Sequence, residues 1–341
     1  MGAASQGTPL SNPSSTPLVI ALGDPAGIGP EVVLKALAQP EAAGRPVMIV
    51  GCRQWLERTY GNLRHCSDAP LADPADLLVV DAPLEATVTP GVGSAASGAA
   101  SFTWLSRAFE LVHSGAGRAL VTAPIAKAAW HAAGHPYPGQ TERLAELCGI
   151  RQASMLFTAR PSQGGWRFNT LLATTHIPLA QVPGALNPEL VTLQLDRLLA
   201  FCRRFHAHPH LVVAGLNPHA GESGALGLEE QIWLESCLKS WQSNHPEVRL
   251  EGPLPPDTCW LEAGRAWQQN ESGPDGFLAL YHDQGLIPVK LLAFERAVNT
   301  TLGLPFLRTS PDHGTAFGIA GRGIARSMSM AAALETAWEL G

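Results

Sequence analysis

The alternation of short apolar runs with helical patterns is the feature that most limits what this chain can fold into. Seven runs of four to six residues have the composition of buried strands. They cover residues 18–22, 46–51, 77–80, 119–122, 168–172, 211–214 and 276–281. Helical patterns cover residues 32–38, 95–113, a segment through Lys127 and Trp130 after the turn at 123–124, and then 140–147, 188–205 and 229–240. This alternation predicts an α/β fold with a mostly parallel sheet.

The length of 341 residues predicts about two domains. The Pro- and Gly-rich bridge at residues 134–139 is the best hinge candidate. We therefore expect a first domain of residues 18–133 with 300–341, and a second of residues 134–299 that carries the metal and substrate half. Residues 1–17 are rich in Ser, Gly, Pro and Ala and have no apolar signal segment, which predicts a disordered tail.

Charge and cysteine usage exclude several classes of function. The formal net charge of −6 argues against nucleic acid or an anionic membrane as a partner. No apolar run approaches the length of a membrane span. The six cysteines form no CxxC pair, so we expect free thiols in a reducing compartment and a cytoplasmic protein.

Three histidines each follow one of the apolar runs at a turn. His282 comes directly after the run at 276–281 and is followed by Asp283. His176 and His219 follow the runs at 168–172 and 211–214. Side chains at strand ends tend to face a site, and three imidazoles with an open position suit a catalytic metal. Their separations are too long for a local metal motif, so three unrelated histidines remain the alternative.

The glycine-rich segment Gly23–Glu31 follows the first apolar run and precedes a helical pattern. It resembles a phosphate-binding loop, but it has neither the GxGxxG order nor a Walker lysine. Its spacing favours a tight turn between a strand and a helix.

Seven ordered motifs together resemble the 4-hydroxythreonine-4-phosphate dehydrogenase family of vitamin B6 biosynthesis, over residues from about 18 to 330. The motifs are Gly23–Glu31, Thr122–Lys127, Thr174–His176, Leu216–Glu222, Gly252–Thr258, Tyr281–Gly285 and Arg308–Ala316. The resemblance implies two α/β domains with mostly parallel sheets, similar to the metal-dependent β-decarboxylating dehydrogenases. It also implies a homodimer with its active site at the subunit interface.

The implied reaction is oxidation of 4-phosphohydroxy-L-threonine by NAD or NADP, with loss of CO2 to give 3-amino-2-oxopropyl phosphate. The resemblance implies one divalent metal per site, zinc, magnesium, cobalt or manganese. The metal would polarise the hydroxyl and take up enolate charge. The family's metal ligands fall on His176, His219 and His282, and its substrate-binding residues on Gln140, Thr141, Lys290, Asn299 and Arg308.

The roles of Asp257, Asp283 and the segment 313–315 need separate consideration. Asp283 would orient a metal ligand, whereas Asp257 would either transfer a proton or serve as a turn residue. The segment His313, Gly314 and Thr315 resembles a loop that contacts the adenosine part of the nucleotide, or it is a tight glycine turn.

Gln140 departs from the family, which has a histidine there; an amide can donate a hydrogen bond but cannot become cationic. A related phosphorylated sugar acid, 4-phosphothreonate or 4-phosphoerythronate, is therefore an alternative substrate. A metal-dependent hydrolase and a non-catalytic metal-binding protein are alternatives from other classes.

Overall fold

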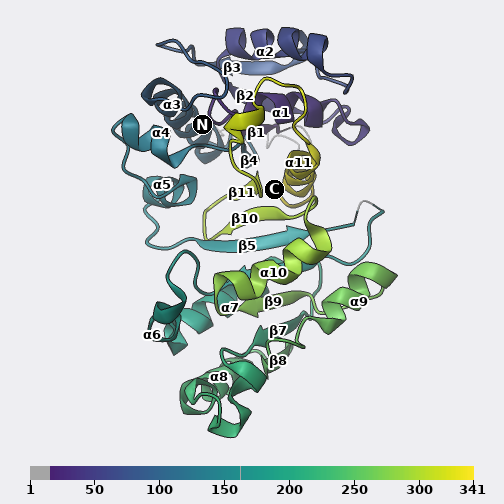
Figure 1. Cartoon of the computed structure of the whole chain (residues 1–341). Helices are drawn as coiled ribbons and strands as arrows, with labels where there is room; N and C mark the ends of the chain where they lie inside the picture. Colours follow the sequence, from purple (N-terminus) through teal and green to yellow (C-terminus); the bar gives the residue numbers. More distant parts are fainter. Residues whose placement is uncertain (1–15, 162) are drawn as a thin grey trace, which may run out of the picture.

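The structure, a computed structural model, describes residues 16–161 and 163–341 (Figure 1). Nearly all of the predicted tail lies outside the described residues. The strands are β1 (Leu18–Ala21), β2 (Val47–Gly51), β3 (Leu78–Asp81), β4 (Ala119–Thr122), β5 (Ser154–Ala159), β6 (Phe168–Leu172), β7 (His210–Ala214), β8 (Arg249–Leu254), β9 (Gly276–Ala279), β10 (Val298–Leu302) and β11 (Leu307–Pro311). They form one 11-stranded sheet in the order β3-β2-β1-β4-β11-β10-β5-β6-β9-β7-β8.

The sheet contains two parallel sets of strands that run in opposite directions. Strands β1 to β4 and β11 form the first set, and β6 to β9 form the second. Between them, β10 is antiparallel to both β11 and β5, and β5 is antiparallel to β6. Three reversals of direction therefore separate the two sets. The prediction of an α/β fold with a mostly parallel sheet is confirmed.

The helices cover both faces of this sheet. They are α1 (Gly29–Leu37), α2 (Arg53–Cys66), α3 (Ala95–His113), α4 (Lys127–Ala132), α5 (Gln140–Leu147), α6 (Val182–Ala185), α7 (Pro188–Cys202), α8 (Glu235–Asn244), α9 (Leu261–Gln269), α10 (His282–Ala293) and α11 (Met328–Leu340). Helix α3 packs on β1, β2 and β4, while α11 packs on β4, β10 and β11. In Figure 1, α3, α4 and α5 lie to the left of the strands and α11 to the right.

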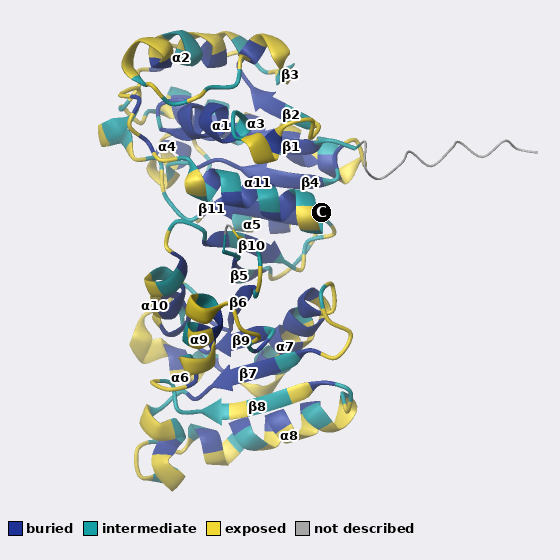
Figure 2. Ribbon diagram, turned by 90° about the vertical axis from the view of Figure 1, so that its right-hand side faces the viewer, coloured by how far each residue is buried: buried dark blue, intermediate teal, exposed yellow. Residues whose placement is uncertain are grey.

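Apolar side chains form one core around β1 to β4 and two smaller cores around the strands of the other half. Figure 2 shows the dark, buried strands running without a break from β2 to β7. The division into two domains at residues 134 and 300 stays a prediction. None of the helices among the described residues is long and apolar enough to cross a membrane.

The predicted strands and helices agree with the structure to within a few residues where apolar periodicity is strong. The helix over 95–113 has the predicted bounds, and its first turn is stabilised by a reciprocal cap between Ser94 and Ser97. The elements without a strong apolar run were not predicted: α2, β5, α6, β8, α9, α10, β10, β11 and α11. In β10 the polar residues Asn299, Thr300 and Thr301 hide a strand from apolar-run rules.

Candidate functional site

A cavity of about 450 Å³ lies over one face of the sheet where the two parallel sets meet. Seven predicted site residues line this cavity, namely Gln140, Thr141, His176, Asn299, Arg308, His313 and Gly314. The antiparallel register explains part of this grouping. Asn299 pairs with Ser310 and Thr301 with Arg308, so these side chains share one face of β10 and β11.

Arg308 is buried beneath this cavity, with 3% of its surface exposed. Its Nε and Nη2 atoms donate to the Thr122 hydroxyl at 3.0 and 2.7 Å, and Nη1 donates to the Thr301 hydroxyl at 3.2 Å. No ion pair among the described residues includes Arg308. Burial lowers its pKa to about 10, and the charge of Glu142 opposes that shift. A buried cation held by hydroxyls can still bind an anion from the cavity.

Two further cavity residues have buried polar atoms without a hydrogen-bond partner. Within the described part of the chain, Asn299 Oδ1 and His313 Nε2 are unpaired. Buried polar atoms in proteins are normally paired, so these two atoms are suited to contact water or a ligand.

The first turn of α5 forms another wall of the cavity. Gln140 Nε2 donates to the carbonyl oxygen of Ala123 at 3.1 Å, which ties α5 to the loop after β4. Thr141 Oγ1 lies 3.5 Å from Nη1 of Arg308. The α5 N-terminus thus brings backbone N–H groups and a hydroxyl close to the buried guanidinium.

His176 and His282 lie side by side, with ring centroids 5.4 Å apart. They follow β6 and β9, which are neighbouring parallel strands. The Nδ1 atom of His282 contacts Asp283 Oδ1 at 2.7 Å, which leaves Nε2 for another partner. Partial burial, followed by the nearby His282 and Lys127, lowers the pKa of His176. A lowered pKa favours the neutral imidazole, which is the form that binds a metal.

His219 occupies an unusual backbone segment after β7, the strand beside β9. Residues 219–223 all have positive φ angles, between 43° and 87°, so the chain makes a left-handed turn. The fully buried Glu230 anchors this turn by accepting from the backbone N–H groups of Leu216 and Asn217, both at 2.8 Å. Such a conformation costs energy at non-glycine residues, and the Glu230 anchor offsets part of this cost.

The three histidines do not form a closed cluster in the described residues. No group of three or more His, Cys, Asp or Glu side chains there lies close enough to hold a metal ion. His219 is largely exposed, and its Nδ1 atom lies 3.8 Å from Glu222 Oε2. The structure therefore brings together two members of the predicted trio and leaves the third on the adjacent strand end.

The remaining predicted site residues lie outside the cavity lining. Lys290 forms an ion pair with Asp312 and lies against the ring of Phe294. Asp257 is exposed in the turn after β8. Thr315 accepts from the N–H of Ile28 at 2.9 Å through its carbonyl oxygen.

Gly27 explains the last of these contacts. A β-carbon at Gly27 would come within 2.9 Å of Thr315, so only glycine allows the two segments to pack. The glycine-rich segment is thus a tight turn, as its spacing favours, and it supports the loop at 313–315.

Sequence reasoning missed four residues that build the cavity. Thr122 and Thr301 hold Arg308, while Lys127 and Glu142 line the wall near His176. Threonines in the fully buried positions of a strand are the signal that could have identified the first two. Lys127 lies in the motif Thr122–Lys127, which could have identified it as a site residue. Glu142 carries no comparable signal, because charged residues at helix starts are common.

Comparison with known proteins places these features in a family. The family model described as pyridoxal phosphate biosynthetic protein PdxA matches residues 42–337. The chain is 65% identical over 329 residues to a protein of Synechococcus sp. (strain RCC307) named 4-hydroxythreonine-4-phosphate dehydrogenase. This alignment covers 96% of the chain and 100% of that protein.

Two further matches extend the comparison. A protein of Pectobacterium atrosepticum named D-threonate 4-phosphate dehydrogenase is 38% identical over 336 residues, covering 95% of this chain and 98% of that one. The crystal structure of 4-hydroxythreonine-4-phosphate dehydrogenase from Klebsiella pneumoniae superposes with a TM-score of 0.80 at 38% identity. It covers 95% of this chain and 98% of the other.

Proposed function

The chain belongs to the family of the pyridoxal phosphate biosynthetic protein PdxA and is an oxidoreductase, and from this we propose its reaction. It oxidises the secondary alcohol of 4-phosphohydroxy-L-threonine with NAD or NADP. The resulting keto acid loses its carboxyl group as CO2, which leaves 3-amino-2-oxopropyl phosphate. The relative at 65% identity, named for this substrate, supports the proposal.

The observation that carries the proposal is the buried guanidinium of Arg308, which has no ion-pair partner in the part of the chain that the structure describes. A guanidinium can hold a phosphate or carboxylate oxygen pair through parallel hydrogen bonds. Thr141 and the unpaired Asn299 Oδ1 border the same space and would orient the rest of the substrate. Lys290 would join this group only if its ion pair with Asp312 opened.

His176, His219 and His282 would hold one divalent cation, either zinc, magnesium, cobalt or manganese. The neighbouring rings of His176 and His282, and the lowered pKa of His176, fit this role. When bound, the cation would polarise the substrate hydroxyl and stabilise the negative charge that develops during decarboxylation. Asp283 would fix the orientation of the His282 ring.

His313, Gly314 and Thr315 would contact the nicotinamide nucleotide. The unpaired, buried Nε2 of His313 fits a polar contact of this kind. The packing of Thr315 on Gly27 would keep the loop in place when the nucleotide binds.

We also propose a homodimer with the active site at the subunit interface. Helix α10 has a stripe of exposed apolar residues at Ile287, Leu291 and Phe294, with exposures of 59%, 80% and 60%. A stripe of this size on one helix face is typical of a surface that packs against another protein. Asp257, which lies outside the cavity of its own chain, would act in proton transfer only across such an interface.

A substrate panel tests the reaction. Absorbance at 340 nm reports formation of the reduced nicotinamide with 4-phosphohydroxy-L-threonine, 4-phosphothreonate or 4-phosphoerythronate, each with NAD and NADP. We expect the highest kcat/KM with the first substrate, and activity that requires both the nucleotide and a divalent metal. Turnover without nicotinamide would favour the hydrolase instead.

A dehydrogenase of a phosphorylated sugar acid is the second candidate. Gln140, which replaces the family's histidine at the cavity wall, favours it, and so does the relative named for D-threonate 4-phosphate. Selective oxidation of 4-phosphothreonate in the same panel would establish this alternative.

A further inference from the structure

A second pocket, of about 600 Å³, lies around the outer side of α11. It shares no lining residue with the cavity at Arg308. The two spaces lie on opposite faces of the sheet. Arg308 and Ser310 face the cavity, whereas Thr309 between them donates from its hydroxyl to the carbonyl oxygen of Ala333 in α11.

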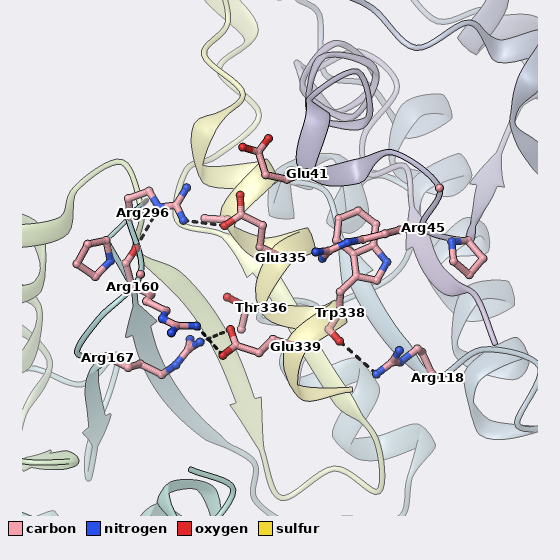
Figure 3. A pocket seen from close by; sticks show the side chains of 15 residues that line it. Glu41, Arg45, Arg118, Arg160, Arg167, Arg296, Glu335, Thr336, Trp338 and Glu339 are labelled. Atoms are coloured by element: carbon pink, nitrogen blue, oxygen red, sulfur yellow. Dashed lines mark hydrogen bonds and ion pairs between the residues drawn. The ribbon is translucent and has the colours of Figure 1, made fainter. Parts of the chain in front are cut away.

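This second pocket carries an excess of positive charge. Its lining includes five arginines but only three carboxylates, Glu41, Glu335 and Glu339. The arginines are Arg45, Arg118, Arg160, Arg167 and Arg296. They come from four segments of the chain, since Arg160 and Arg167 share the connection between β5 and β6, and Figure 3 shows them on both sides of α11.

Three of these arginines already form ion pairs. Arg160 and Arg167 share the carboxylate of Glu339, and Arg296 pairs with Glu335 at 2.7 Å. One carboxylate therefore serves two guanidinium groups on this side of the helix. The positive charge is only partly neutralised.

The other two arginines, Arg45 and Arg118, form no ion pair with an Asp or Glu side chain among the described residues. Arg45 lies over the indole ring of Trp338, 4.9 Å from the ring centroid. The Nη2 atom of Arg118 donates to the backbone oxygen of Gly341 at 2.6 Å and to that of Trp338 at 3.2 Å. The Nε1 atom of Trp338 is itself buried and has no hydrogen-bond partner in the described residues. The ion pairs of the other three arginines therefore do not neutralise Arg45 or Arg118, and both can turn toward an anion in the pocket.

Arg167 indicates the energetic cost of this arrangement. The residue is nine-tenths buried. Burial lowers its pKa most, and the repulsion of Arg160 and Arg296 lowers it further, against the opposing effect of Glu339. A bound anion would relieve this repulsion, because it would add negative charge where guanidinium groups crowd together.

We propose that the pocket around α11 binds a small molecule with a multiply charged phosphate group, such as a diphosphate. Guanidinium forks suit phosphate oxygens, and arginines on both sides of α11 suit an anion with more than one charged group. The half-buried Trp338 ring offers an apolar surface for the organic part of such a molecule. The inference is independent of the proposed reaction.

Calorimetric titration of the full chain with pyrophosphate, at constant ionic strength and without divalent metal, tests this proposal. We expect Arg45→Gln with Arg118→Gln to lower the affinity at least tenfold, because each change removes a charged donor. Arg58→Gln is the matched control, since Arg58 also lies over a tryptophan, Trp55, but lines no part of this pocket. Orthophosphate should bind more weakly than pyrophosphate.

A third variant separates this site from the catalytic cavity. Arg308→Gln should leave pyrophosphate binding at α11 within twofold of the wild type. Loss of binding in Arg308→Gln, together with wild-type binding in the Arg45/Arg118 variant, would overturn the proposal. Should the double variant fail to fold, Arg45→Gln alone serves, because Arg45 is exposed and forms no ion pair among the described residues.

Discussion

The two sides of the candidate active site are built in different ways. The guanidinium of Arg308 is buried, hydrogen-bonded to Thr122 and Thr301, and placed by the register of β10 and β11. Around the histidines, the side chains lie on connections at strand ends, and His219 is largely exposed. The comparison teaches that the support of Arg308 is built from residues of one chain. We infer that the histidine side reaches its final arrangement only with a cation or a second subunit.

The largest effect is expected from Arg308→Met, which removes the buried charge. The value of kcat/KM should fall about a hundredfold or more, because a charged hydrogen bond is lost. The folded-state pKa of about 10 lies below the ordinary value of 12.5, so burial of the charge destabilises the fold at every pH below about 10. The variant should therefore keep its stability or gain up to about 3 kcal/mol.

Steady-state kinetics and urea unfolding at pH 7 measure both quantities. Loss of stability together with full activity would show that Arg308 stabilises the fold and does not bind substrate. The contrast between the Arg308 side and the histidine side of the site would then not hold.

A smaller effect is expected from His282→Ala, which tests the exposed side. Metal affinity should fall at least 10- to 100-fold, because mutation of a residue that only orients a metal ligand already lowers metal affinity by about that factor. Activity should fall in parallel when metal is limiting. Isothermal titration with zinc after chelation measures the affinity, and the exposed His65 provides the control His65→Ala. Equal metal affinity in both variants would end the three-histidine proposal.

Gln140→His tests the cavity wall that lies near both Arg308 and His176. If 4-phosphohydroxy-L-threonine is the substrate, its KM should stay the same or fall by up to about tenfold. The gain should be largest at acidic pH, because histidine becomes cationic near its ordinary pKa of about 6.5. Kinetics from pH 6 to pH 8 measure this. A weaker reaction with that substrate and no pH dependence would count against an anion contact at this position.

Asp24→Asn should have the smallest effect, on stability. Burial raises the pKa of Asp24 above 3.8, against the hydrogen bonds from Ala26 and Ser97. Because the folded-state pKa is raised, the ionised carboxylate destabilises the fold above that pKa. The cost disappears as the pH falls through the folded-state pKa toward 3.8.

The asparagine variant should therefore exceed the wild type in stability more at pH 7 than near pH 4. Urea unfolding at the two pH values tests this. A constant difference between the two proteins would show that burial of Asp24 carries no charge penalty.

The sequence predicted much of the fold because its buried strands are continuous apolar runs. Strand β9 could be located in this way, and helix α3 by its helical apolar periodicity. Strands β10 and β11 could not, since Asn299, Thr301 and Arg308 occupy positions that apolar rules assign to loops. The polar residues that hide these strands are the ones that build the cavity.

The sequence predicted which residues belong to the candidate site better than it predicted how they are arranged in space. Strand-end reasoning predicted that all three histidines would meet. They follow neighbouring parallel strands, and the structure brings His176 and His282 side by side. The same reasoning could not identify Thr122 as the support of Arg308, because that contact depends on a pairing of strands 186 residues apart. Nor could it predict the left-handed turn at His219, which depends on the buried Glu230.

The position of the β10–β11 hairpin has a consequence for synthesis of the chain. It lies between β4 and β5 in the finished sheet, although it follows both by more than a hundred residues. While a ribosome is still making the segment up to β9, the edges of β4 and β5 have no partner between them. Open strand edges of this kind pair readily with other chains. The nascent protein is thus most exposed to misassembly just before the strands that carry Asn299 and Arg308 emerge.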